Sequence, residues 1–196
     1  MVEKIYLIRH GLTESNKKKI YAGWCDEDVS EEGLGALIEI GRKLSGYKIE
    51  KIFSSPIRRA VQTAEVMKYF LNVPLEVEKN LIEMKMGPWE GLTEYQGKKG
   101  YSKEWKIWNS KPSLLKLDGR ETLEEVQQRA LKSIERISNY SDISNVLAVT
   151  HVAIIRILLV YFNKLLMDEY RKIKIPNGAV YLLDCREIKK RIKRVI

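Results

Sequence analysis

Segments with the pattern of buried strands alternate with helical segments along the chain, and this alternation predicts an α/β fold. The strand-like runs KIYLIR (4–9) and NVLAVT (145–150) are largely apolar, which is typical of parallel strands covered on both faces. A single stretch, residues 84 to about 120, departs from the alternation. We therefore expect a three-layer α/β/α sandwich with a mostly parallel central sheet and a small cap insertion.

The expected elements follow in order from the N-terminus. After strand 4–9 comes a helix at 30–46, with Ser30 as a plausible N-cap and Gly46 just beyond its end. Strand 51–55 is next, and Pro56 occupies the favoured first position of a helix that continues to about Leu71. The remaining elements are a short strand at 75–78, a helix at 121–140, a strand at 145–150, a buried helix at 152–162 and a strand at 179–185.

Three of the four tryptophans lie in the segment that breaks the alternation. We expect this segment to form a cap over the sheet. At 196 residues the whole chain, 1–196, is then one domain with a cap excursion at about 84–120. The apolar and aromatic residues of the cap are Met84, Met86, Trp89, Tyr95, Tyr101, Trp105 and Trp108.

Composition excludes several classes of protein. No apolar run reaches the ~18 residues of a membrane span, and the N-terminus MVEKIYLIRHG carries charges where a signal peptide is apolar, so we expect a cytoplasmic protein. Cys25 and Cys185 are too few for a disulfide framework or a CxxC metal site. The net charge is +9, and residues 186–194 (REIKKRIKR) hold six basic residues and one acidic residue. We interpret this tail as a solvated basic end rather than a nucleic-acid site.

Both histidines of the chain directly follow expected parallel strands. His10 follows strand 4–9 and His151 follows strand 145–150, so both belong to the edge where α/β sheets bind ligands. Arg9 accompanies His10, and the end of strand 51–55 adds Arg58 or Arg59. Arginines suit a phosphate dianion, and they lower the pKa of a neighbouring imidazole and so keep it neutral and nucleophilic. Phosphoryl transfer is the predicted reaction class, with no metal and no cofactor.

Five segments, in order, resemble those of the histidine phosphatase superfamily, also called the phosphoglycerate mutase-like family. LIRHGLTESN (7–16) is similar to its RHG signature. The others are SSPIRRAVQTAE (54–65), LIEMKMGPWEGLT (81–93), DGRETLEEVQQR (118–129) and VLAVTHVAIIRIL (146–158). The resemblance extends to about residue 185.

The resemblance implies a role for each matched residue. His10 would attack phosphorus and become a phosphohistidine, while Arg9, Arg58 and His151 hold the oxygens of the transferring group. Glu83 would protonate the leaving oxygen and then activate water. Thr13 and Asn16 would complete the phosphate pocket with the backbone around Gly23. From the residues alone, Glu90 competes with Glu83, and Arg59 remains an alternative to Arg58.

Two positions depart from the family pattern. Ala22 stands where many relatives have Gln or Thr before Gly23, which removes a side-chain donor to the phosphate. Val152 stands where glycine more often follows the second histidine, and its branched side chain narrows the space beside His151. We expect both residues to border the substrate.

The resemblance favours a phosphatase that acts on a small-molecule phosphate monoester. A cofactor-dependent phosphoglycerate mutase and a non-enzymatic relative that binds phosphorylated ligands are the alternatives. The cap tryptophans and Trp24 could line the pocket for the organic part of the ester, but a small aromatic core within the cap is the favoured interpretation.

Overall fold

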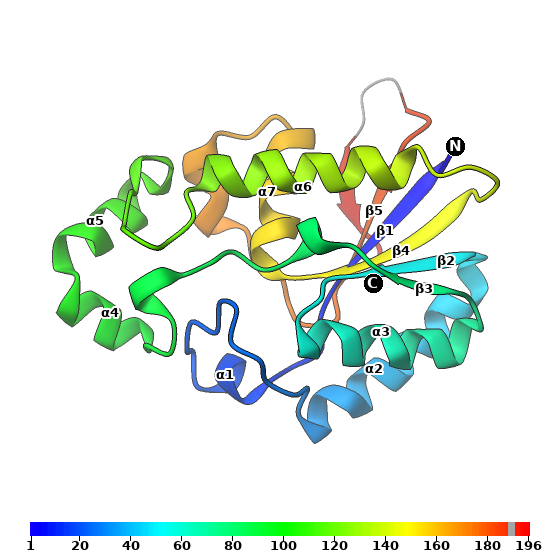
Figure 1. The fold of residues 1–196 in the computed structure, drawn as a ribbon, viewed down its shortest axis with the longest axis horizontal. Coiled ribbons are helices and arrows are strands. Elements are labelled where there is room, and N and C mark those ends of the chain that lie inside the picture. Colours follow the sequence, from blue (N-terminus) through cyan, green and yellow to red (C-terminus); the bar gives the residue numbers. More distant parts are fainter. Residues whose placement is uncertain (188–190) are drawn as a thin grey trace.

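A single sheet of six strands organises the chain in the computed structural model, which describes residues 1–187 and 191–196 (Figure 1). The strand order is β3-β2-β4-β1-β5-β6. Strands β3, β2, β4 and β1 are parallel neighbours, and β5 is antiparallel to both β1 and β6. The strands are β1 (Lys4–Arg9), β2 (Lys51–Ser54), β3 (Leu75–Val77), β4 (Asn145–Thr150), β5 (Val180–Asp184) and β6 (Ile192–Arg194).

Helices cover both faces of this sheet. Helices α2 (Glu31–Leu44) and α3 (Arg58–Leu71) lie on one face, and α6 (Leu123–Ser138) and α7 (Val152–Phe162) lie on the other (Figure 1). Side chains of β1 alternate between the two cores: Ile5 and Leu7 pack toward α6 and α7, whereas Tyr6 and Ile8 pack toward α2 and α3. The expected three-layer α/β/α fold with a mostly parallel sheet is confirmed.

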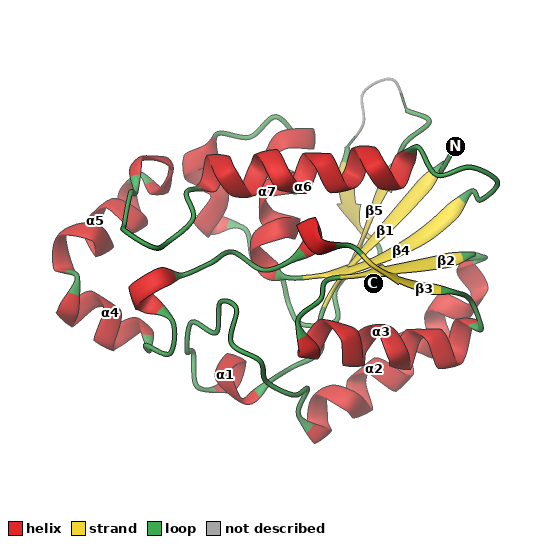
Figure 2. Cartoon of the chain, in the orientation of Figure 1, coloured by secondary structure: helices red, strands yellow, loops and turns green. Residues whose placement is uncertain are grey.

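The cap lies beyond the carboxyl ends of the parallel strands (Figure 2). It contains α4 (Glu94–Gly100), α5 (Ser102–Ser110) and two short 3-10 turns, Gly87–Trp89 and Pro112–Leu114. Trp89 is fully buried, with its ring centroid 5.5 Å from that of Trp105 and 6.2 Å from that of Trp108. The expected aromatic core of the cap is therefore present, and it is continuous with the core beneath α6 and α7.

Local capping explains where the longer helices begin. The hydroxyl of Ser30 accepts the N–H of Gly33 at the start of α2, as expected. Thr122 and Glu125 form a capping box at the start of α6, so this helix begins two residues later than expected. Helix α3 begins at Arg58 rather than at Pro56, because Ile57 is still extended. The four-residue helix α1 (Glu14–Lys17) was not expected.

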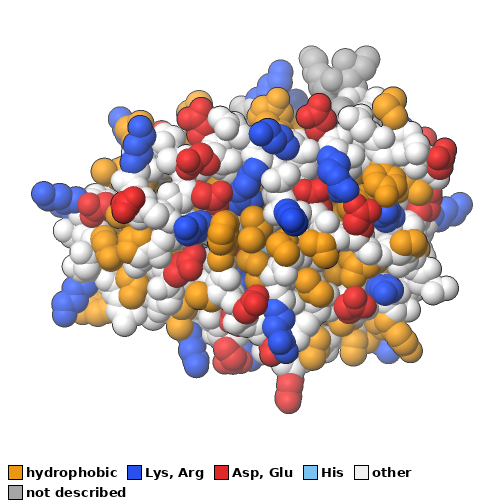
Figure 3. Space-filling model, in the orientation of Figure 1, with side chains coloured by type: hydrophobic (Ala, Val, Ile, Leu, Met, Phe, Trp, Pro, Cys, Tyr) orange, Lys and Arg blue, Asp and Glu red, His pale blue; other side chains and the backbone are white. Residues whose placement is uncertain are grey.

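The basic C-terminal segment is partly folded, which corrects the expectation of a solvated end. Strand β6 pairs with β5, and Ile192 opposite Leu183 is only 4% exposed. Residues 188–190 of the predicted tail lie outside the described residues. On the face shown in Figure 3, basic and acidic side chains are interspersed rather than gathered by sign. In the described residues, no helix is long and apolar enough to cross a membrane.

Candidate active site

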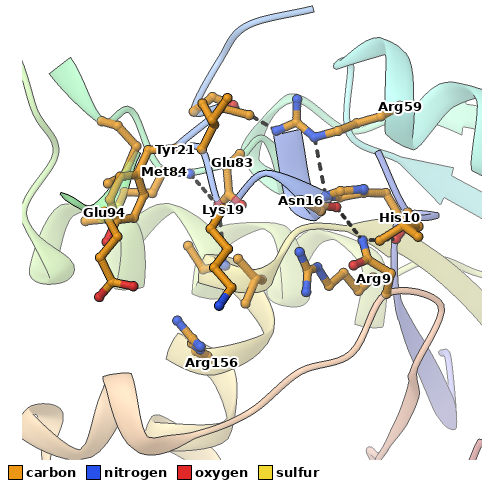
Figure 4. Close-up of a pocket in the computed structure, with 18 of the residues that line it drawn as sticks. Arg9, His10, Asn16, Lys19, Tyr21, Arg59, Glu83, Met84, Glu94 and Arg156 are labelled. Atoms are coloured by element: carbon orange, nitrogen blue, oxygen red, sulfur yellow. Dashed lines mark hydrogen bonds between the residues drawn. The ribbon is translucent and has the colours of Figure 1, made fainter. Parts of the chain in front are cut away.

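A cavity of about 330 Å³ lies between the carboxyl ends of the strands and the cap. Its walls come from segments far apart in the sequence: the end of β1, the loop after α1, the start of α3, the first turns of α7 and the loop before β5. Figure 4 draws 18 of the lining residues and labels ten of them. His10 lines this cavity, and the fully buried His151, which is not among the lining residues, lies next to it with ring centroids 5.1 Å apart, so the two histidines come together as predicted.

His10 is held in one tautomer. Its Nδ1 lies 2.8 Å from the carbonyl oxygen of Gly11, and because a carbonyl can only accept, Nδ1 carries the proton. The lone pair is therefore on Nε2. Burial lowers the pKa of His10 well below its usual value, and the cations of Arg9 and Arg59 lower it further. The imidazole is neutral at physiological pH, as a nucleophile requires.

Arg59, rather than Arg58, is the arginine beside His10. The Nε–H of Arg59 donates to Nε2 of His10 at 3.3 Å, and its two terminal nitrogens donate to the carbonyls of Cys25 and Gly23 at 2.9 and 2.8 Å. Arg58 does not line the cavity. Its side chain is 61% exposed and pairs with Asp28 at 2.5 Å. The preference for Arg58 is thus corrected, and the alternative residue, Arg59, holds the position.

Arg9 lines the same cavity from the end of β1. One terminal nitrogen donates to the carbonyl of Ile175 at 2.6 Å, whereas the buried Nε has no hydrogen-bond partner in the part of the chain that the structure describes. Burial lowers the pKa of Arg9 to about 10 against the opposing effect of Glu83. A buried donor without a partner costs free energy unless an acceptor arrives, so this group is suited to an incoming anion.

His151 is fully buried at the N-cap of α7 and is fixed by Ser55, which the sequence did not single out. The hydroxyl of Ser55 accepts the N–H of Ile57 at 3.3 Å and lies 2.6 Å from Nε2 of His151. No other acceptor for the Ser55 proton occurs among the described residues, so we assign the donor role in this contact to the hydroxyl and the His151 proton to Nδ1. Among the described residues Nδ1 has no hydrogen-bond partner, so as a donor it is suited to an incoming anion.

The structure separates the two candidate carboxylates. Glu83 lines the cavity and is 7% exposed, and burial raises its pKa. Its Oε1 accepts the N–H groups of Met84 and Ala153 at 2.8 and 3.3 Å. Glu90 lies outside the lining and accepts the N–H groups of Trp24 and Met86, so it ties the 22–24 loop to the cap. Glu83 is the carboxyl group placed to exchange a proton in the cavity.

The predicted binding residues divide into two groups. Asn16, Ala22, Gly23 and Val152 line the cavity. Thr13 does not: its hydroxyl accepts the N–H of Asn16 as the cap of α1 and donates to Glu27 at 2.8 Å. Thr13 therefore positions the loop rather than facing the cavity, which corrects its predicted place. Gly23 has a φ of +50°, and a Cβ there would come within 2.3 Å of the Glu90 carboxylate.

Two tryptophans lie close to the cavity in different ways. Trp108 lines it, so one ring of the cap core also faces the space open to a substrate. Trp24 is 42% exposed and donates from Nε1 to the carbonyl of Glu83 at 2.6 Å, which fixes the backbone of the buried acid. Arg129 donates to the same carbonyl at 3.0 Å.

Several lining residues were missed by the sequence analysis. Asn177 donates to the carbonyls of His10 and Gly11 and, at 2.7 Å, to Oδ1 of Asn16. The Asn-Gly pair before β5 is an ordinary turn signal, so it carried no functional hint. Arg156 also lines the cavity, and its Nε donates to the carbonyl of Ile173 at 2.7 Å. The outer wall also contains Lys19, Tyr21, Glu94 and Tyr170.

Chemically, the inner part of the cavity combines three functions. A neutral imidazole presents a lone pair, two guanidinium groups flank it, and a carboxyl group with a raised pKa lies opposite. These are the parts that phosphoryl transfer to a nitrogen nucleophile requires. In the described parts of the chain, no group of three His, Cys, Asp or Glu side chains could hold a metal ion.

Comparison with known proteins places this site in a family. The chain is 28% identical to phosphoserine phosphatase 1 of Hydrogenobacter thermophilus over 153 residues, which cover 78% of this chain and 72% of that protein. The structure of YhfR from Bacillus stearothermophilus superposes with a TM-score of 0.89 at 25% identity, over 98% of this chain and 95% of that one.

A phosphoserine phosphatase from Entamoeba histolytica, solved with 3-phosphoglyceric acid, shares the fold with a TM-score of 0.85 at 20% identity. The two chains overlap over 98% of this one and 95% of that one. The sequence model of branch 1 of the histidine phosphatase superfamily matches residues 5–196, and this protein belongs to that superfamily.

Proposed function

We propose that this protein is a metal-independent phosphomonoester hydrolase that works through a phosphohistidine on His10. The observation that carries the proposal is the state of His10: a buried, neutral imidazole with its lone pair on Nε2 beside the guanidinium of Arg59. Phosphatase-named relatives and the superfamily itself support a phosphatase activity. The acid-phosphatase-like reaction and the residue roles below are parts of the proposal.

In the first step, Nε2 of His10 attacks the phosphorus atom and a P–N bond forms. The bond from phosphorus to the ester oxygen breaks, and that oxygen takes the proton of Glu83. A raised pKa suits this role, because Glu83 must enter the reaction protonated. The products of this step are the free alcohol, the phosphohistidine and the Glu83 carboxylate.

In the second step, the Glu83 carboxylate takes a proton from water, and the water oxygen attacks phosphorus. The P–N bond breaks, inorganic phosphate forms and the lone pair returns to Nε2. Throughout both steps, Arg9, Arg59 and the Nδ1–H of His151 donate to the phosphoryl oxygens, whose charge is spread in the transition state. These donors supply the charge stabilisation that a metal ion provides in other phosphatases.

The substrate is proposed to be a small phosphate monoester. A cavity of about 330 Å³ lies near the lower end of the size range for ligand pockets. The relatives are named for phosphoserine and for glucosyl-3-phosphoglycerate, so esters of this kind are the first to test.

The test is a phosphoprotein trap. Brief incubation with a ³²P-labelled monoester followed by denaturation should yield a label that is acid-labile and alkali-stable, and EDTA should leave turnover unchanged. His10→Ala should abolish both the label and phosphate release. Rapid interconversion of 2- and 3-phosphoglycerate with little free phosphate would instead indicate a mutase, and binding of phosphorylated ligands without either reaction would indicate a non-enzymatic relative.

A further inference from the structure

The outer half of the cavity contains basic side chains in addition to those proposed to bind the phosphoryl group. Arg9 and Arg59 flank His10 and match the two negative charges of a phosphate monoester. Lys19 and Arg156 line the same cavity, and Figure 4 shows their side chains reaching into it from different elements. The cavity therefore contains two cations beyond the pair at the reacting centre.

Arg156 is fixed and lacks a counter-ion. Its Nε donates to the carbonyl of Ile173 at 2.7 Å, and its guanidinium carbon lies 5.4 Å from the ring centre of Tyr170. Within the described residues, no carboxylate pairs with it. Nε is engaged and the guanidinium also hydrogen-bonds the Tyr170 side chain, which leaves terminal N–H groups of Arg156 that can donate to a carboxylate oxygen.

Lys19 also lacks an ion pair in the described part of the chain, and its backbone is unusual. Its φ of +54° is the left-handed conformation, just past the end of α1, where glycine is the common residue. Two acidic residues line the cavity, Glu83 and Glu94. Glu94 lies 3.5 Å from Arg171 and so already has a cationic partner. The outer half of the cavity thus remains net positive.

We propose that Lys19 and Arg156 form a second anion subsite, which selects phosphate monoesters that carry a carboxylate a few bonds from the ester oxygen. The inference rests on the proposed function and names its substrate class. The limited volume of the cavity favours a small carboxylate on the same short chain over a distant anionic group.

The test uses two substrates that differ only in the second anion. 3-Phosphoglycerate has a carboxylate where glycerol 3-phosphate has a hydroxymethyl group. We expect kcat/KM to be ten- to a hundredfold higher for 3-phosphoglycerate, since a charge-assisted hydrogen bond contributes about that factor. Lys19→Gly and Arg156→Met should each lower this ratio about tenfold, and Arg156→Lys should lower it less because the charge is kept.

The chain offers a matched control for Lys19. Lys48 is also an exposed lysine with a left-handed backbone, φ +50°, but it precedes β2 at the opposite edge of the sheet. Lys48→Gly removes the same charge and relieves the same strain, so the ratio should stay at the wild-type value. An equal fall in Lys48→Gly would show that net charge, not a subsite, sets the preference.

The remaining outcomes are separable. If the protein hydrolyses p-nitrophenyl phosphate but kcat/KM is about equal for 3-phosphoglycerate and glycerol 3-phosphate, and Lys19→Gly does not change that ratio, the subsite is overturned. The phosphatase function would still stand. Without hydrolysis of any ester, the proposed function fails, and calorimetric binding of both compounds to the protein still tests the subsite: equal affinities overturn it. The same ratio of kcat/KM can be measured for fructose 1,6-bisphosphate against fructose 6-phosphate, which differ by a second phosphate. If this ratio exceeds the ratio for 3-phosphoglycerate against glycerol 3-phosphate, the assignment of the subsite to a carboxylate is overturned.

Discussion

Arg58 and Arg59 are adjacent arginines in opposite environments, so exchanging each for methionine tests the candidate site. Arg59→Met removes a guanidinium that donates to His10 and to the carbonyls of Gly23 and Cys25. Loss of one preorganised donor typically lowers kcat by ~10²–10³, and this donor also orders the loop at Gly23. We expect kcat/KM to fall by about 10³, equivalent to ~4 kcal/mol of transition-state stabilisation.

The large loss of activity in Arg59→Met should not be accompanied by a large loss of stability. Burial lowers the pKa of Arg59, which shows that the folded protein disfavours its charge, and methionine fills much of the same volume without that charge. We therefore expect only a small fall in the Tm of Arg59→Met, caused by the carbonyls of Gly23 and Cys25 that lose their donor. A large fall in Tm would mean that the loss of activity reports unfolding.

Arg58→Met is the matched control. Arg58 is exposed and its pair with Asp28 is exposed as well, and surface pairs contribute little. The expected kcat/KM is within about twofold of the wild type. The assay is hydrolysis of p-nitrophenyl phosphate, with thermal melts followed by circular dichroism. Equal losses in the two variants, or a larger loss in Arg58→Met, would refute the placement of Arg59 at the reacting centre.

Three further variants test the other parts of the site. Glu83→Gln should slow alkyl esters far more than p-nitrophenyl phosphate, which needs no acid; equal losses would remove Glu83 from that role. Burial raises the pKa of Glu83 above its value in the unfolded chain, so stability falls as the pH rises from the unfolded-state pKa through the folded-state pKa, and Glu83→Gln should raise the Tm at pH 8 but not at pH 4.5. Ser55→Ala should lower kcat about tenfold by freeing the His151 tautomer, with rescue by Ser55→Thr and a changed ¹⁵N shift of the His151 ring; an unchanged ¹⁵N spectrum would contradict the tautomer argument. Gly23→Ala should reduce both stability and activity, because a Cβ would clash with Glu90 and the φ of +50° disfavours alanine; a Tm equal to that of the wild type would contradict this.

Strong local patterns made most of the fold predictable. Strands β1 and β4 and helix α7 are apolar runs whose length and composition leave few alternatives. Strand β6 carried no such pattern, since Ile192 is the only apolar residue in it and lies among the basic residues Arg191, Lys193 and Arg194. Its strand conformation comes from hydrogen bonds with β5, which are tertiary contacts, so the segment was interpreted as a solvated tail.

The outer half of the cavity escaped prediction for a related reason. Asn177 contacts His10 across 167 positions of sequence, and Lys19 and Arg156 meet in one cavity from different layers of the fold. Each of these residues is ordinary in its own segment: an Asn-Gly turn, a surface lysine, and an arginine in an apolar helix. Only the arrangement of the strands and loops brings them together.

The choice between Arg58 and Arg59 was different, because the sequence did contain the answer. Positions i, i+4 and i+8 share a face of a helix, and on α3 the series from Arg59 continues through Thr63 to Met67, all buried. The series from Arg58 continues through Gln62 to Val66, which are only partly buried. Once residues after Pro56 are assigned to a helix whose apolar stripe faces the sheet, the stripe itself points Arg59 inward. The register of the helix, rather than the residue type or a motif position, decides which of two identical side chains lines the cavity.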